Sequence, residues 1–182
     1  MNKEKFVIRE FLQFSIQAGF STRNEDYPVY DLASASFSLN KAKALKVDIR
    51  TFLMSSCAEL QGKRVSEEAH IKRIEALSTQ ISQRYKSILN KGRFRIGVSQ
   101  KTINLFLKYL WSVNLIKEPH HCPFDNLLKL KLRKYAGDHG LVDWTEMKSL
   151  KEYQSYVSAV SKAAEAEKTS IAKWEMKNWK RR

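Results

Sequence analysis

Basic side chains are the residues of this sequence best suited to hold a ligand, and most of the positive charge lies in one region. Residues 84–135 contain twelve basic residues and two acidic ones, which accounts for +10 of the net charge of +14. Such a concentration of charge attracts polyanions, and nucleic acid is the commonest polyanion that a soluble protein meets. The charge distribution therefore predicts a protein that binds DNA or RNA.

Two clusters within this region supply the candidate phosphate contacts. One cluster is residues 90–98 (NKGRFRIGV), in which arginines flank Phe94. An aromatic ring in that setting can stack on a base, but single aromatic residues more often pack in a core, so we expect Phe94 to be buried and both arginines to point to solvent. The other cluster lies on a helix predicted over residues 123–136. The predicted contacts are Arg93, Arg95, Lys129, Arg133 and Lys134.

The segment 118–125 (EPHHCPFD) carries residue types that can hold a metal or act as a nucleophile. His120, His121, Cys122 and Asp125 are all metal-ligand types, but zinc sites use spaced pairs of ligands, and this segment has no second pair. Cys122 beside His121 could form a nucleophile and base, yet neighbouring side chains usually point apart. We therefore predict no metal, no cofactor and no catalytic residue, and interpret the segment as a corner between helices.

Two stretches resemble known protein families. Residues 98–119 (VSQKTINLFLKYLWSVNLIKEP) resemble a helix of the core-binding domain of tyrosine recombinases, which implies helical DNA binding. Residues 133–139 (RKYAGDH) are similar to the pattern of Arg, four to six residues, then His in the HEPN ribonucleases, all-helical domains that cleave RNA as dimers. This second resemblance implies a metal-independent ribonuclease with His139 as general acid or base. That enzyme is the alternative to a non-catalytic binder.

The element that must position both basic clusters is a helix predicted over residues 99–116, with Ser99 as its N-cap. At 100° per residue, only Lys101, Asn104, Lys108 and Ser112 form a polar strip, so this helix should be buried at the centre of the protein. We predict an all-α fold, a single globular bundle of six to seven helices around it. Further helices are expected over residues 3–18, 38–60, 66–88 and 123–136. Another helix should begin at the capping box Ser149–Glu152, and Thr169 or Ser170 should cap a last short helix.

The composition fits one folded domain. The chain has 182 residues, of which 43% are hydrophobic, with only 6 Gly and 3 Pro. We expect residues 1–182 to form a single helical domain. In an alternative arrangement, residues 150–182 form a C-terminal helical extension of that domain. Charges interrupt every long apolar stretch, which argues against a membrane span or signal peptide and favours a cytoplasmic location. A helical module for protein interaction, including a homodimer, is the third functional alternative.

Overall fold

The computed structural model describes residues 2–63, 65–137 and 140–179, and within them the fold is all-α, as predicted. No strand occurs in these ranges, and none of their helices is long and apolar enough to cross a membrane. The seven α-helices of the described ranges are α1 (Lys3–Phe20), α2 (Leu39–Leu60), α3 (Glu67–Tyr85), α4 (Ile96–Ser112), α5 (Asn126–Leu132), α6 (Leu150–Ala166) and α7 (Ile171–Asn178). Three short 3-10 helices are η1 (Lys86–Ile88), η2 (Asn90–Gly92) and η3 (Arg133–Tyr135).

Side-chain caps explain where most of these helices begin. Ser38, Ser66, Ser149 and Ser170 each accept a hydrogen bond from a backbone N–H of the first turn that follows, which satisfies a donor with no partner inside the helix. The predicted capping box is confirmed, because Glu152 also accepts from the N–H of Ser149. These polar contacts coincide with the helix starts and can be recognised from the local sequence.

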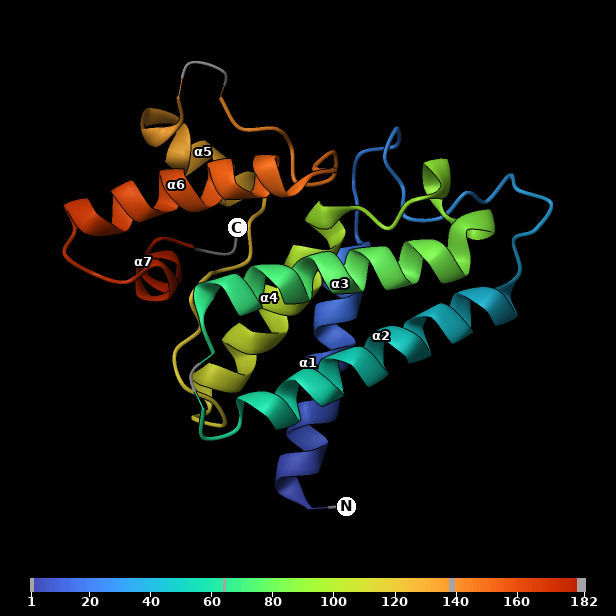
Figure 1. Ribbon diagram of the computed structural model, residues 1–182, viewed down its shortest axis with the longest axis horizontal. Coiled ribbons are helices and arrows are strands. Elements are labelled where there is room, and N and C mark those ends of the chain that lie inside the picture. Colours follow the sequence, from blue (N-terminus) through green and yellow to red (C-terminus); the bar gives the residue numbers. More distant parts are fainter. Residues whose placement is uncertain (1, 64, 138–139, 180–182) are drawn as a thin grey trace.

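Helix α4 is the buried centre of the bundle, although it begins and ends earlier than predicted. It contacts α1, α2, α3 and α6, and Figure 1 shows α2 and α3 side by side in opposite directions across it. Ser99 is not its N-cap. That residue lies inside the helix, fully buried, and its hydroxyl donates to the carbonyl oxygen of Ile74 (3.0 Å). The core residues form one hydrophobic cluster that extends from Ile8 on α1 to Trp174 on α7.

The predicted polar strip of α4 is exposed only at its last residue, Ser112. Asn104 is fully buried and forms the centre of a hydrogen-bond network. Its Oδ1 accepts from His70 Nε2 (2.8 Å), and its Nδ2 donates to the carbonyl oxygen of Cys122 (2.9 Å) and to the Tyr153 hydroxyl (3.2 Å). Residues of α6 and of the segment 118–125 cover this part of the strip. Helical periodicity identifies a polar face but not what packs against it.

Two predicted helices are shorter than expected. The helix expected over residues 123–136 is α5 followed by η3, and Asp125 is its N-cap, accepting from the N–H of Leu128 (3.0 Å). The helix expected to reach residue 88 ends at Tyr85 and continues as η1. As a result α2, with 22 residues, is longer than α3, with 19. In both regions a single 3-10 turn takes the place of the predicted end of the α-helix.

Gly97 allows α4 to pass closely by the segment before α6. Its N–H donates to the carbonyl oxygen of Met147 (3.0 Å), and a Cβ at this position would overlap the carbonyl oxygen of Trp144.

We expect Gly97→Ala to lower the free energy of unfolding by about 3 kcal/mol, because the Trp144 backbone would have to move. Gly137→Ala is the matched control. A Cβ there would meet no atom of the described residues within 4 Å, so the expected change is below about 0.5 kcal/mol. Urea unfolding of both variants checks this, and equal losses would contradict the close approach.

Candidate nucleic-acid interface and groove

The structure places the five predicted contact residues in three different settings. Arg93 is exposed between η2 and α4, and Arg133 and Lys134 are exposed in η3. Lys129 is half-buried and forms an ion pair with Asp143 (2.7 Å). Figure 1 shows α5 at the upper left and the green turns η1 and η2 at the upper right, so the two predicted clusters are separate.

Arg95 is buried, contrary to the expectation that it points to solvent. One terminal nitrogen of its guanidinium donates to the carbonyl oxygens of Tyr27 (2.6 Å) and Pro28 (3.1 Å), and the other donates to Asn90 Oδ1 (3.4 Å). Burial lowers the pKa of Arg95. A charged group is kept inside a protein when hydrogen bonds satisfy it, so Arg95 fastens the segment 21–31 to the start of α4. It is not available to a ligand at the surface.

Only part of the positive charge in residues 84–135 remains free. Besides Arg95, four of the twelve basic residues form ion pairs, which are Arg84 with Asp48, Lys101 with Asp125, Lys108 with Glu175, and Lys129 with Asp143. The other seven are exposed and have no ion-pair partner in the part of the chain that the structure describes. They are Lys86, Lys91, Arg93, Lys117, Lys131, Arg133 and Lys134.

Three cations from two segments, residues 90–98 and residue 148, lie around the ring of Tyr27. Lys91 Nζ lies 4.9 Å from the ring centre, Arg95 Cζ 5.7 Å and Lys148 Nζ 5.7 Å. Lys91 and Lys148 are exposed, and exposed Arg93 follows two residues after Lys91. We call Tyr27, Lys91, Arg93 and Lys148 the junction surface. Tyr27 and Lys148 were not among the predicted contacts, because each lies at least fifty residues from the 90–98 cluster.

The second exposed basic set lies on α5 and η3. We call Lys131, Arg133 and Lys134 the α5 surface. All three side chains are exposed, and Lys134 Nζ lies 4.8 Å from the centre of the Tyr135 ring. Unlike Lys129, none of them has an ion-pair partner among the residues described. The α5 surface therefore keeps its positive charge available.

An open groove runs along α4 between the end of α1, the start of α5 and the residue that follows α7. It consists of two adjoining hollows of about 650 and 750 Å³. Both hollows are lined by Ala18, Ser21, Lys101, Asp125 and Trp179. We call the two hollows together the α4 groove. Its size suits a ligand of drug or nucleotide dimensions.

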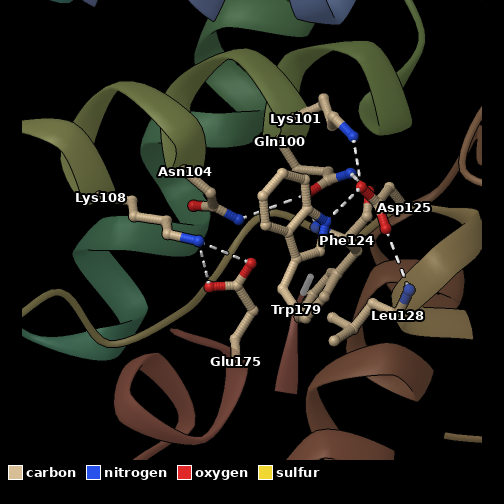
Figure 2. Close-up of polar contacts among 9 residues, drawn as sticks. All are labelled: Gln100, Lys101, Asn104, Lys108, Phe124, Asp125, Leu128, Glu175 and Trp179. Atoms are coloured by element: carbon tan, nitrogen blue, oxygen red, sulfur yellow. Dashed lines mark hydrogen bonds and ion pairs between the residues drawn. The ribbon is translucent and has the colours of Figure 1, made fainter. Parts of the chain in front are cut away.

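Two lysine–carboxylate pairs form the floor of the α4 groove (Figure 2). Lys101 Nζ lies 2.9 Å from Asp125 Oδ2, and Lys108 Nζ lies 3.0 and 2.7 Å from the two oxygens of Glu175. Trp179 connects the pairs, because its Nε1 donates to Asp125 Oδ2 (3.2 Å) while its ring centre lies 5.0 Å from Lys108 Nζ. The two lysines of the predicted polar strip are thus held by carboxylates from other elements.

The two carboxyl groups of the floor have opposite pKa shifts. Burial acts to raise the pKa of Asp125, but Lys101 and the hydrogen bonds that Asp125 accepts outweigh it, so this pKa lies below its usual value. The pKa of Glu175 is raised, because burial outweighs the effect of Lys108. Two lysines beside two carboxyl groups leave the floor with little net charge. Such a floor suits the hydrogen-bonding edge of an uncharged planar group better than a phosphate.

The corner at residues 118–125 is structural in this geometry. His121 is buried between the Tyr153 hydroxyl (2.7 Å from Nδ1) and Glu67 (2.9 Å from Nε2), which fits a ring that accepts at Nδ1 and donates at Nε2. Cys122 is buried, and burial raises the pKa of its thiol, which opposes formation of a nucleophilic thiolate. Across residues 2–63, 65–137 and 140–179, no three His, Cys, Asp or Glu side chains are placed to hold a metal ion.

The ribonuclease alternative depends on a residue that lies outside the described ranges. Arg133 is exposed in η3, whereas His139 is not among the described residues. The relative positions of the two side chains therefore stay a prediction from the sequence. No protein-family model, curated protein sequence or solved structure matches this chain, so the functional argument rests on its own residues.

Proposed function

We propose that this protein binds nucleic acid without acting on it chemically. The junction surface is the main contact area, and the α5 surface is a second one. The observation that carries the proposal is the group of cations around Tyr27, which come from two segments far apart in the chain and include two exposed lysines without acidic partners in the described ranges. A fold that gathers unpaired cations at one place keeps a field there that attracts phosphates.

The chemistry of these surfaces favours contacts to the sugar–phosphate backbone. Lys and Arg side chains neutralise phosphates and release bound counterions, which supplies most of the affinity of non-specific binding. Such contacts position a nucleic acid but carry no sequence information. We therefore expect similar affinity for strands of unrelated sequence.

Neutralising the junction surface tests the proposal. The variant Lys91→Gln, Arg93→Gln, Lys148→Gln is expected to weaken binding of a fluorescein-labelled oligonucleotide by at least about tenfold at low salt, because three phosphate contacts are lost. Fluorescence anisotropy measures the affinity, and circular dichroism checks that the variant stays helical.

The matched control removes the same charge elsewhere. Lys3, Lys43 and Lys162 are exposed helix residues without ion pairs in the described structure, and changing all three to Gln should weaken binding less. Changing exposed Glu25 and Asp26, which precede Tyr27, to Gln and Asn should strengthen binding. Equal losses from the two triple variants would mean that only net charge matters, and the junction surface would then not be the site.

A further inference from the structure

We infer that the α4 groove receives unpaired bases, so that the preferred ligand is single-stranded nucleic acid. This inference rests on the proposed function and adds the class of ligand to it. Single-strand binders combine cations that follow the backbone with aromatic side chains on which bases stack. The α4 groove and the junction surface together provide both parts.

The groove and the junction surface are joined by two short segments. Asn24 lines the groove, and Tyr27 of the junction surface follows three residues later. Thr145 also lines the groove, and Lys148 again follows after three residues. Three residues of extended chain span at most about 10 Å. A strand whose phosphates contact the junction surface can therefore direct its next bases into the groove.

Aromatic rings line the groove from three elements. Phe14 comes from α1, Tyr109 from α4, and Trp179 from the residue after α7. Phe14 is 52% exposed, so its ring is accessible to a base that enters the groove. Every base has a face that stacks on such rings, whatever the sequence.

Polar groups at the other end of the groove offer partners to base edges. Asn24 and Asn126 carry amides there, and exposed Arg23 adds a cation without an ion-pair partner in the described structure. Thr145 lines the same hollow, but its hydroxyl is fully buried, so the amides and the Arg23 guanidinium are the polar groups within reach of a base.

The low net charge of the groove floor favours bases over phosphates. Lys101 and Lys108 are already paired with Asp125 and Glu175, so a phosphate entering there would meet two carboxyl groups. A base is uncharged and presents donors and acceptors at its edge. In a duplex those edges are paired and the faces are stacked inside, and the groove then cannot reach them.

Three labelled DNA probes separate bases from phosphates. The first is a single strand of about twelve nucleotides, within the site size of single-strand binders. The second is the same strand with abasic sugars throughout, and the third is the duplex of the same sequence. At equal salt, we expect the intact single strand to bind at least about fivefold more tightly than the abasic strand, with the duplex also weaker.

Two matched phenylalanine variants locate the effect. Phe14→Ala should lower the affinity for the intact strand by at least about fivefold and leave the affinity for the abasic strand unchanged. Phe6→Ala is the control, because Phe6 is on the same helix and is 49% exposed, but it does not line the groove. Both side chains are exposed, so neither change should unfold the protein.

Each result decides for or against the inference. Equal binding of the intact and abasic strands would overturn it and leave the proposed function standing, because the phosphates alone would account for the affinity. Equal effects of Phe14→Ala and Phe6→Ala on the intact strand would also overturn it. Failure of all three probes to bind would overturn the proposed function and this inference together.

Discussion

Replacing Asn104 with alanine is expected to lower the free energy of unfolding by about 3–5 kcal/mol, because buried polar groups would lose their partners. The His70 Nε2–H would lose its acceptor, and the Cys122 carbonyl oxygen would lose its donor. Both groups lie inside the protein, where water cannot replace the lost hydrogen bonds. An effect of this size is a large fraction of the stability of an ordinary domain.

Urea unfolding measures this change. Ser112→Ala is the control on the same helix, because Ser112 is exposed and its hydroxyl bonds only to the nearby carbonyl oxygen of Tyr109. We expect a change below about 0.5 kcal/mol for that variant. A loss of less than about 1 kcal/mol for Asn104→Ala would show that the buried network does not stabilise the core.

Acidification below pH 6.5 is expected to destabilise the protein through His70. Burial, and then the nearby charge of His121, lowers the pKa of His70 from 6.5 to about 3. Between these two values the unfolded chain binds a proton at His70 and the folded protein does not. The free energy of unfolding therefore decreases as the pH is lowered through this range, by up to about 1.4 kcal/mol per pH unit. Burial also lowers the pKa of His121, which acts in the same direction.

Unfolding in urea between about pH 7 and pH 4.5 tests this slope, since most carboxyl groups titrate below that window. His70→Gln is the informative variant, because its amide can still donate to Asn104 but does not titrate. We expect it to show a shallower dependence on pH than the unchanged protein. Constant stability of the unchanged protein from about pH 7 to pH 5 would contradict the buried, neutral state of His70.

Much of the fold could be predicted because its signals are local. Helix starts depend on caps such as Ser38 and Ser149, and a cap acts within three residues. Burial of Phe94 could also be predicted, because a large apolar side chain gains by leaving water wherever it lies. The start of α4 could not be predicted, because it depends on a hydrogen bond from Gly97 to Met147, fifty residues away.

The candidate site was harder to predict, because its contacts join distant segments. Arg93 and Arg95 are two arginines close together in the sequence, yet Arg93 is exposed and Arg95 is buried. The buried guanidinium of Arg95 donates hydrogen bonds to the carbonyl oxygens of residues 27 and 28. Lys101 and Lys108 share a face of α4, as predicted, but Asp125 and Glu175 cover that face. No local pattern marks Lys148 as a neighbour of Tyr27.

The salt dependence of binding tests the central claim most directly. The affinity of the unchanged protein for a labelled DNA duplex would be measured by anisotropy over a series of salt concentrations. Three phosphate contacts from the junction surface predict a slope of about −2.7 for the logarithm of the binding constant against that of salt, and contacts from the α5 surface would steepen it. Absence of binding of both this duplex and the matching single strand at low salt, or binding that salt does not weaken, would contradict a nucleic-acid interface made of these cations.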